Sequence, residues 1–291
     1  LDAGDEVVVF EPMYDSYQAC IALAGGVAKP VVLRPGAGPD GRYGFDPDEL
    51  RAAISPRTKL MLFNTPHNPT GKVFTRAELE LIAGLAQEHD LIVVTDEVYE
   101  HLVFSGAEHV PLATLPGMAE RTLTISSGGK TFNTTGWKIG WACGPEPLVT
   151  AARTAKQFLT YVNGAPFQPA IATGLGLGDD FYKGLAVDLE TKRDRLLVGL
   201  HAAGFDVFTP EATYFTTVDI RPIAPDGDGY AFCRALPELI GVVAIPNQVF
   251  YAHQEHGRHL VRFACCKRLE VLDDAVERLT RLPDAIGGAG G

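Results

Sequence analysis

Short apolar runs alternate with segments of helical periodicity over the first half of the chain. The β-branched runs at residues 6–10 (EVVVF) and 91–95 (LIVVT) are typical of strands that are buried on both faces of a sheet. Four further runs predict strands at residues 28–33, 59–63, 121–125 and 137–143. Because helical patterns separate these runs, the first half predicts a mostly parallel sheet with helices on its faces.

Two of the predicted helices begin at clear capping signals. Asp46 precedes Pro47 and lies three residues before Glu49, an arrangement that favours a helix start. Residues 75–78 (TRAE) form a capping box and predict a second helix. A third helix is predicted at residues 14–23, where a pair of glycines ends it. These helices fall between the predicted strands, as the crossover connections of a parallel sheet require.

The second half of the chain has a different pattern. A long charged helix is predicted at residues 181–203, and short strands and helices alternate after it. The strands are expected at residues 214–220, 242–245 and 260–263, and the helices at residues 230–239 and 269–282. We therefore expect a large domain at residues 1–180, a smaller α+β domain at residues 181–285, and a disordered glycine-rich tail at residues 286–291.

The composition argues against several classes of function. The 291 residues carry a net charge of −11 without a basic stripe, so we expect no nucleic-acid partner. No apolar run reaches about 18 residues, so no membrane-spanning helix is expected. The five cysteines lack a CxxC spacing, and the eight histidines lack a recurrent ligand spacing. We therefore expect reduced cysteines in a cytoplasmic protein without a metal site.

Polar residues follow three of the predicted strands at the point where each strand ends. The segment NTPHNPTG follows the strand KLMLF, DEVY follows LIVVT, and SSGGK follows RTLTI. Open α/β sheets bind ligands beyond the carboxyl ends of their strands. The sequence therefore predicts a site at this edge, built from amides, an acid, a phenol, hydroxyls and a lysine.

These segments also resemble a known family. NTPHNPTG, TDEVY, SSGGKTFNTTGWKIGW and VRF occur in the order and approximate spacing of class I aminotransferases, which are fold-type I pyridoxal-phosphate enzymes. The resemblance runs from EPMYDSY to VRFACCK, and the lysine followed by TGWKIGW is its most specific part. It implies an α/β fold with a mostly parallel sheet of the seven-stranded type and a smaller C-terminal α+β domain. It also implies pyridoxal 5'-phosphate as cofactor and a homodimer.

The resemblance assigns the central chemical roles to four residues. Lys130 is expected to form the Schiff base with the cofactor and then to move the proton at the substrate's α-carbon. Asp96 is expected to keep the cofactor's ring nitrogen protonated, because a buried carboxylate stabilises a nearby cation. Tyr99 and Asn68 are expected to hydrogen-bond the phenolate oxygen of the ring.

The remaining predicted contacts hold the cofactor and the substrate. Ser127 and Lys138 are expected to bind the phosphate, and Tyr14 to stack on the ring. Arg262 is expected to bind the substrate's α-carboxylate, together with Asn68, because a planar guanidinium binds a carboxylate through parallel hydrogen bonds. The resemblance also predicts two cis bonds, Asn68-Pro69 and Glu11-Pro12.

We expect that the sequence is an N-terminally truncated member of this family. It begins at Leu1 without a starting Met, at residues that predict a turn leading into a strand. In the family the preceding region carries the first strand and helix of the large domain and a loop that binds the phosphate. We therefore expect these 291 residues alone to bind the cofactor poorly and to be inactive.

The amino donor stays open. The resemblance is to the branch that contains methionine, kynurenine and N-succinyldiaminopimelate aminotransferases, with an L-amino acid as donor and a 2-oxo acid such as 2-oxoglutarate as acceptor. Residues 161–168 (YVNGAPFQ) contain no arginine, which disfavours aspartate as donor. Two alternatives remain open: a β-C–S lyase of the same fold, and a non-catalytic ligand-binding module of the kind found in certain transcription regulators.

Overall fold

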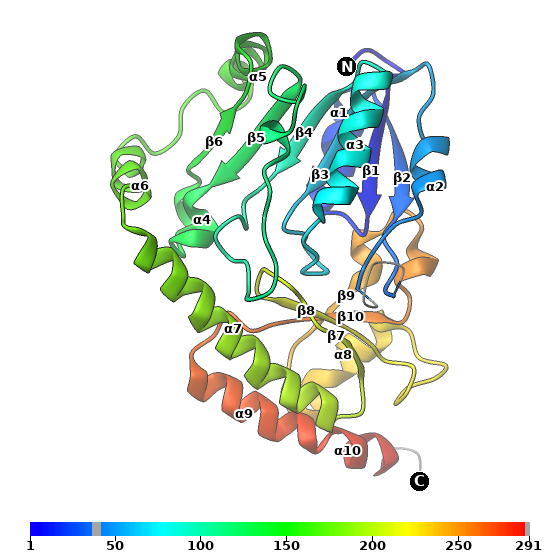
Figure 1. Ribbon diagram of the computed structural model, residues 1–291. Helices are drawn as coiled ribbons and strands as arrows, with labels where there is room; N and C mark the ends of the chain where they lie inside the picture. The colour runs from blue at the N-terminus through cyan, green and yellow to red at the C-terminus, as the bar shows by residue number, and fades with distance from the viewer. Residues whose placement is uncertain (37–41, 289–291) are drawn as a thin grey trace.

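The computed structural model describes residues 1–36 and 42–288, which fold around two β-sheets (Figure 1). In these residues the larger sheet has six strands in the order β2-β1-β3-β4-β5-β6. The strands are β1 (Glu6–Glu11), β2 (Val27–Val32), β3 (Thr58–Asn64), β4 (Ile92–Asp96), β5 (Thr122–Ser127) and β6 (Gly140–Cys143). All neighbours in it are parallel except β5 and β6, which confirms the predicted mostly parallel α/β sheet.

Strand β1 shows why the larger sheet is covered on both faces. Val8 and Phe10 pack into the core beneath α2 (Pro47–Ala52) and α3 (Arg76–Glu88). Val7 and Val9 point to the opposite face and pack with Tyr17 and Ile21 of α1 (Asp15–Leu23). Since successive side chains of a strand alternate between faces, a strand buried on both faces must be apolar throughout. The run of valines in β1 meets this requirement.

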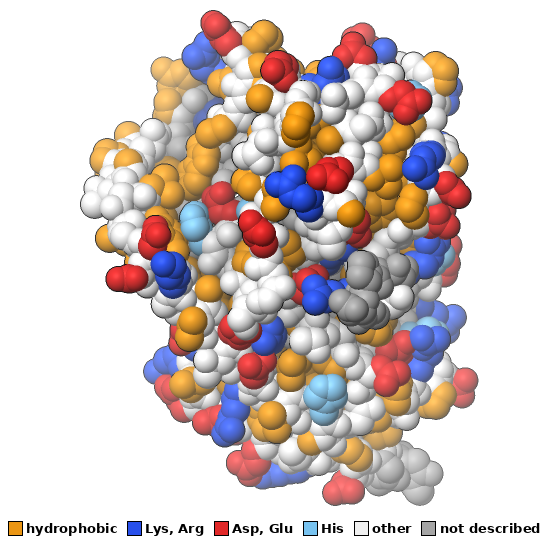
Figure 2. Space-filling view, in the orientation of Figure 1, with side chains coloured by type: hydrophobic (Ala, Val, Ile, Leu, Met, Phe, Trp, Pro, Cys, Tyr) orange, Lys and Arg blue, Asp and Glu red, His pale blue; other side chains and the backbone are white. Residues whose placement is uncertain are grey.

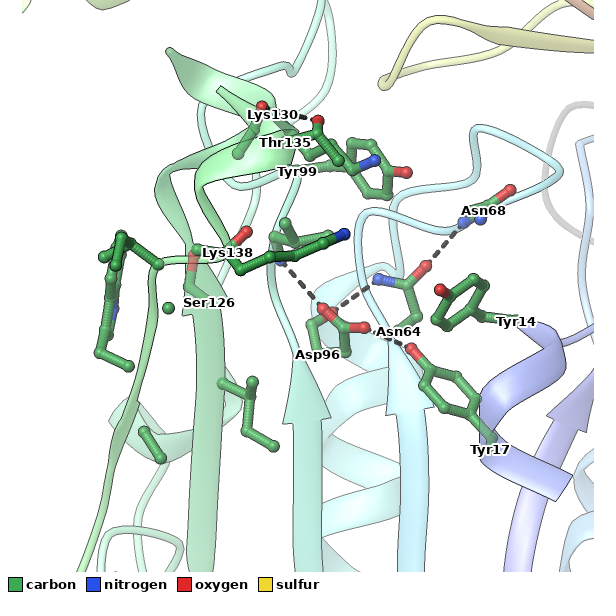
Figure 3. Close-up of a pocket in the computed structure, with 18 of the residues that line it drawn as sticks. Tyr14, Tyr17, Asn64, Asn68, Asp96, Tyr99, Ser126, Lys130, Thr135 and Lys138 are labelled. Carbon is green, nitrogen blue, oxygen red and sulfur yellow. Dashed lines mark hydrogen bonds between the residues drawn. The ribbon is translucent and has the colours of Figure 1, made fainter. Parts of the chain in front are cut away.

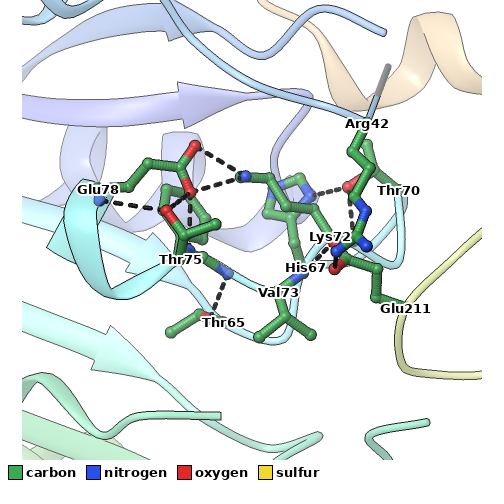
Figure 4. Close-up of polar contacts among 10 residues, drawn as sticks. Arg42, Thr65, His67, Thr70, Lys72, Val73, Thr75, Glu78 and Glu211 are labelled. Atoms are coloured by element: carbon green, nitrogen blue, oxygen red, sulfur yellow. Dashed lines mark hydrogen bonds and ion pairs between the residues drawn. The ribbon is translucent and has the colours of Figure 1, made fainter. Parts of the chain in front are cut away.

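The predicted capping signals lie where helices α2 and α3 begin. The Asp46 side chain accepts a hydrogen bond from the Asp48 backbone N–H, and Pro47 takes the first position of α2. Thr75 and Glu78 exchange side-chain to backbone hydrogen bonds at the start of α3 (Figure 4). These caps satisfy N–H groups that have no partner within their own helix.

The smaller sheet is antiparallel, in the order β7-β8-β10-β9. Its strands are β7 (Asp206–Phe208), β8 (Phe215–Asp219), β9 (Ile245–Pro246) and β10 (Leu260–Ala264). Four helices accompany it: α7 (Asp179–Ala202), α8 (Gly229–Ile240), α9 (Leu269–Thr280) and α10 (Leu282–Gly288). Their apolar side chains share one core with β8 and β10. This arrangement is the predicted smaller α+β unit, and we propose residues 1–180 and 181–285 as the domain limits.

The expected disordered tail needs one correction. Helix α10 extends to Gly288, so residues 286–288 are helical instead of disordered. Ile286 packs against the core of the smaller unit, which gives this last turn an apolar anchor. Residues 289–291 of the expected tail lie outside the described residues.

Two predicted strands are shorter in the structure. The strand predicted at residues 137–143 begins at Gly140, because Thr135–Trp137 form a 3-10 turn and Lys138 takes a left-handed conformation with φ of 57°. The strand predicted at residues 242–245 reduces to β9. Helices α5 (Glu146–Leu159) and α6 (Phe167–Leu175) lie between β6 and α7, where no element was predicted.

The surface carries mixed charge. Basic and acidic side chains are interspersed over the face shown in Figure 2. Among the described residues, no helix has both the length and the apolar character that a membrane crossing needs.

Candidate active site

The carboxyl ends of β3, β4 and β5 meet at a cavity of about 800 Å³ that also reaches the smaller sheet (Figure 3). Three strands of the larger sheet supply its floor, and β10 supplies Arg262 from the other side. All of the site residues predicted from the sequence line this cavity: Tyr14, Asn68, Asp96, Tyr99, Ser127, Lys130, Lys138 and Arg262. The structure thus brings them together, while their individual roles stay predictions.

Asp96 is the last residue of β4 and is held by two hydrogen bonds. The Tyr17 hydroxyl donates to it at 2.5 Å, and the Val98 backbone N–H donates at 3.2 Å. Burial raises the pKa of Asp96, whereas these two hydrogen bonds and the charge of Lys130 act to lower it. Burial and the neighbouring Asp96 charge also raise the pKa of Tyr17, so its phenol remains a donor. Tyr17 therefore supports the ionised form of Asp96.

A chain of hydrogen bonds connects Asp96 to the opposite side of the cavity. The Asn64 amide donates to the Asp96 backbone carbonyl at 2.7 Å, and its oxygen accepts from the Asn68 backbone N–H at 2.7 Å (Figure 3). The Asn68 side-chain oxygen accepts in turn from Arg262 at 2.7 Å. Asn64 thus fixes the loop that presents Asn68, and Asn68 contacts the guanidinium of the smaller sheet.

Arg262 lies on β10 close to two aromatic rings. Its guanidinium carbon is 4.0 Å from the centre of the Phe215 ring and 4.7 Å from the centre of the Phe250 ring. Stacking of this kind favours the cation and fixes the plane of the guanidinium. Burial lowers the pKa of Arg262. A guanidinium carries five N–H donors, so the group can bind a carboxylate through its edge while its faces stay covered.

Lys130 lies on the short helix α4 (Gly128–Thr131), directly after β5. Its amine is 6.0 Å from the centres of both the Tyr99 and the Tyr214 rings. Two glycines precede it where the chain is closely packed: a Cβ at Gly128 would lie 2.5 Å from the end of the Ile171 side chain, and a Cβ at Gly129 would lie 3.1 Å from the Thr135 backbone. Burial raises the pKa of Tyr99 well above its ordinary value, so its phenol can donate a hydrogen bond. The glycines thus let the lysine sit at the floor of the cavity.

Ser127 and Lys138 line the side of the cavity nearest β6. The left-handed backbone at Lys138 turns the chain into β6, and its carbonyl accepts a hydrogen bond from Asn163 at 2.6 Å. Lys156 of α5 also lines this side and hydrogen-bonds Thr160 at 2.8 Å. A hydroxyl and a cation at one end of the cavity form a suitable binding set for a phosphate.

The family model described as Aminotransferase class I and II matches residues 1–279. The chain belongs to this family. Members bind pyridoxal 5'-phosphate, and the chain is a pyridoxal-phosphate-dependent aminotransferase with an α/β fold.

Individual relatives agree with this assignment. The chain is 50% identical to the probable N-succinyldiaminopimelate aminotransferase DapC of Mycobacterium tuberculosis, over 98% of the chain and 72% of the relative. It is 37% identical to kynurenine–oxoglutarate transaminase 1 of Rattus norvegicus, over 97% of the chain and 72% of that protein. The solved N-succinyldiaminopimelate aminotransferase of M. tuberculosis superposes with a TM-score of 0.92, covering 97% of the chain and 72% of that structure. A methionine aminotransferase from Escherichia coli superposes with a TM-score of 0.90 at 36% identity, with the same two coverages.

The chemistry of the cavity fits the aminotransferase cofactor. A primary amine (Lys130), a carboxylate (Asp96) and a phenol (Tyr99) surround the floor, and an aromatic ring (Tyr14) lies at the rim. An anion-binding hydroxyl and ammonium lie at the β6 end. These groups match the ring nitrogen, ring oxygen, ring face, aldehyde and phosphate that the cofactor presents. Both predicted cis bonds, Glu11-Pro12 and Asn68-Pro69, are confirmed, and Thr65-Pro66 is a third that was not predicted.

Two residues of the aminotransferase site were not predicted from the sequence. Tyr17 lies three residues after Tyr14, a spacing that places both near one side of α1, and their rings are 5.7 Å apart. Asn64 ends β3 at the edge where polar residues had been expected. The strand-end rule would have found Asn64, whereas the contact between Tyr17 and Asp96 joins residues too distant in the sequence for spacing to reveal.

Proposed function

We propose that this cavity is the aminotransferase active site and that it moves an amino group from an L-amino acid to a 2-oxo acid. The observation that carries the proposal is the meeting of Lys130, Asp96 and Arg262 in one cavity, although they come from α4, β4 and β10. The bound cofactor would supply an electron sink for the pair left when the α-proton departs. The protein residues supply proton transfer, charge and orientation.

Lys130 is the proposed general base and acid. A primary amine suits this role because it can both accept and release a proton at a reacting carbon. In this proposal Lys130 takes the proton from the substrate's α-carbon. It would then deliver the proton to the cofactor carbon that is bonded to the amino nitrogen. Tyr99 and Asn68 would hold the ring oxygen of the bound cofactor, and Tyr14 would pack against its ring.

Asp96 is the proposed partner of the ring nitrogen. A carboxylate in a largely enclosed site stabilises a protonated nitrogen strongly, because little water screens the pair. The hydrogen bonds from Tyr17 and Val98 support the charged form that this role needs. Ser127 and Lys138 are the proposed phosphate contacts at the other end of the ring.

Arg262 is the proposed anchor of the substrate's α-carboxylate. Arg262 lines the cavity with the Phe215 and Phe250 rings close to its guanidinium, and a guanidinium can bind a carboxylate through parallel hydrogen bonds. Asn68 contacts the same guanidinium and is the proposed second substrate contact.

We infer that the amino donor is N-succinyldiaminopimelate or a similar L-amino acid, with 2-oxoglutarate as acceptor. The inference is supported by the 50% identity to the M. tuberculosis protein that carries this name and by the absence of arginine from residues 161–168. A broad enzyme for methionine and aromatic donors is the second candidate, because relatives with those names share 36–37% identity.

An amino-transfer assay tests the proposed function. The full-length protein is supplied with 2-oxoglutarate and with donors that include N-succinyldiaminopimelate, methionine, kynurenine and aspartate, and glutamate formation is measured. We expect the first donor to have the highest kcat/KM, and Lys130→Ala to abolish transfer. Pyruvate release from cystathionine without amino transfer would instead identify a β-C–S lyase. Ligand binding without turnover would identify a non-catalytic module.

We also propose a cytoplasmic homodimer. In the part of the chain that the structure describes, no residue of helix α5 is buried. Phe158 and Leu159 at its end are 86% and 83% exposed. Exposed apolar side chains gathered in this way are typical of an interface. Light scattering after size exclusion of the full-length protein should give twice the mass of one chain, and the mass of one chain would contradict the dimer.

A further inference from the structure

Glu11 is a buried carboxylate that lies outside the described machinery. It ends β1, and its side chain is fully buried, with no exposed surface. A charge in such a position is costly unless hydrogen-bond donors surround it. Its donors therefore reveal which part of the molecule depends on it.

Within the described residues, the side-chain carboxylate of Glu11 takes its hydrogen bonds from one short segment of the smaller unit. Its carboxylate accepts from the backbone N–H groups of Ala252 at 2.9 Å and His253 at 3.2 Å. It also contacts the His253 ring nitrogen Nδ1 at 2.7 Å. The Met13 backbone N–H donates to the Phe250 carbonyl at 2.6 Å, two residues from Glu11 along the chain. Residues 250–253 are thus fastened to the end of β1, more than 200 residues away in the sequence.

The fastened segment carries one wall of the active site. Phe250 lines the cavity and ends the 3-10 turn η4 (Asn247–Phe250). The centre of its ring lies 4.7 Å from the guanidinium carbon of Arg262, and the centre of the Phe215 ring lies 4.0 Å from the same atom. Phe215 and Arg262 are on paired strands, which fix them relative to each other. Phe250 is not on a strand: its turn η4 packs on β10 and α8, and the Met13 N–H and the Glu11 carboxylate hold residues 250–253 from the side of β1.

We propose that Glu11 is a positioning residue for substrate binding: its buried carboxylate clamps residues 250–253 and so holds Phe250 against Arg262. The inference rests on the proposed function, in which Arg262 binds the substrate's α-carboxylate. The clamp keeps the guanidinium plane oriented before the substrate arrives, which reduces the ordering cost of binding. Glu11 itself touches neither the substrate nor the cofactor.

The clamp also joins the two sheets beside the substrate pocket. Any separation of the smaller unit from β1 must either break the contacts to Glu11 or leave residues 250–253 behind. A buried carboxylate without donors is strongly unfavourable, so breaking the contacts to Glu11 is costly. The same segment also packs on the smaller sheet through Tyr251, which contacts Leu260 of β10, so residues 250–253 join the two sheets.

Glu11→Gln tests the clamp in the full-length protein. The substitution keeps the size of the side chain but removes its charge and turns an N–H₂ group toward donors that need an acceptor. The main measurement is the dissociation constant of an unreactive monocarboxylate, 3-phenylpropanoate, by calorimetry. We expect it to rise about tenfold, equivalent to about 1.4 kcal/mol. KM for the donor should rise similarly, with kcat and the cofactor's dissociation constant within about twofold of wild type.

Two further variants separate this role from a general loss of stability. His253→Ala removes the side-chain donor to Glu11 but keeps both backbone donors. The affinity for 3-phenylpropanoate should therefore fall by only about two- to threefold. Phe250→Leu removes the ring that the clamp positions, so in a double-mutant cycle its effect should not add to that of Glu11→Gln. If Glu11 only stabilised the fold, the effects of Glu11→Gln and Phe250→Leu would add. The affinity for the cofactor would then fall as much as the affinity for 3-phenylpropanoate.

The outcomes distinguish the clamp from the proposed function. Unchanged carboxylate affinity in Glu11→Gln, or additivity with Phe250→Leu, would overturn the clamp. If Glu11→Gln does not fold, His253→Ala still decides, because unchanged carboxylate affinity in that variant contradicts the proposal. A wild-type protein that binds the carboxylate but does not transfer amino groups would overturn only the proposed function. A wild-type protein that does not bind the carboxylate would contradict both.

Discussion

The hydrogen bond between Tyr17 and Asp96 shows how a single hydroxyl supports the charge that the site needs. Burial alone would push Asp96 toward its neutral form, which could not hold a protonated ring nitrogen. Tyr17 donates at 2.5 Å from α1, on a different element from β4. The uncharged phenol of Tyr17 therefore favours the ionised form of Asp96.

Removal of this hydroxyl should impair catalysis most at low pH. In Tyr17→Phe the pKa of Asp96 rises further, because a contact that lowers it is lost. We expect kcat/KM to fall about tenfold near neutral pH, since hydrogen bonds to charged groups contribute about 1.5–3 kcal/mol. The acidic limb of the pH profile should move to higher pH. Tyr43→Phe, at a buried tyrosine that does not line the cavity, is the matched control, and equal losses in both variants would refute the role of Tyr17.

The geometry of the guanidinium at Arg262 should matter as much as its charge. Arg262→Lys keeps a cation but loses the planar donor fork and the stacking on Phe215 and Phe250. We expect KM for the amino donor to rise about 10- to 100-fold, in line with the loss of a bidentate contact and a cation–π pair. Steady-state kinetics with saturating acceptor measure this change. A KM within twofold of wild type would show that the carboxylate binds elsewhere.

At the scale of elements, the cap of α3 is tied to a buried ion pair. Glu78 accepts from the Thr75 backbone at 2.8 Å and also pairs with Lys72, whose side chain is only 2% exposed (Figure 4). One carboxylate thus caps the helix and neutralises a buried ammonium. The capping box could be predicted from the sequence, but its second partner could not.

Loss of Glu78 should therefore cost far more stability than loss of an ordinary helix cap. Glu78→Ala leaves Lys72 buried without its counter-ion, and we expect the free energy of unfolding to fall by about 3 kcal/mol or more. Glu80→Ala is the matched control on the same helix, because Glu80 forms an exposed pair with Arg76 that is worth about 0.5 kcal/mol or less. Urea unfolding monitored by circular dichroism gives both values. Similar losses in the two variants would contradict the distinction.

The elements differ in how far the sequence could predict them. Strands β1 and β4 were predicted because unbroken apolar runs leave little alternative, and α2 and α3 because caps mark their starts. Helix α5 was not predicted, and in the described structure none of its residues is buried, so its apolar positions face no core. Helix α6 was not predicted either. Lys138 was predicted as part of a strand because its left-handed backbone depends on the neighbouring turn. All eight predicted site residues line the cavity, because strand ends and family resemblance point to the same edge.

At the scale of the whole molecule, the contact between Glu11 and His253 makes the junction of the two sheets dependent on pH. The carboxylate raises the pKa of His253 above its ordinary value of 6.5 through a hydrogen bond and its charge. A histidine with a raised pKa in the folded state stabilises the protein fully below the unfolded pKa. This stabilisation is lost as the pH rises through the folded pKa.

Comparison of His253→Gln with wild type should reveal this dependence. We expect the difference in melting temperature to be largest below about pH 6.5 and to shrink as the pH rises beyond the folded pKa. Thermal unfolding of both proteins over a pH series measures the difference. His256→Gln is the matched control, since His256 is exposed and lies in the same loop. A difference that grows with pH would reverse the sign and refute the assignment.

The contact between Asn68 and Arg262 has a consequence for how substrate enters. The Asn68 oxygen occupies one donor of the guanidinium at 2.7 Å, as a carboxylate oxygen would. Before the substrate binds, the Asn68 oxygen thus satisfies an N–H group of Arg262, the proposed anchor, that would otherwise lack an acceptor. When a substrate carboxylate binds, this N–H group exchanges the Asn68 oxygen for a carboxylate oxygen, so the number of its hydrogen bonds does not change. The side-chain amide of Asn68 is then released from the guanidinium, so binding at Arg262 acts directly on the loop that presents Asn68.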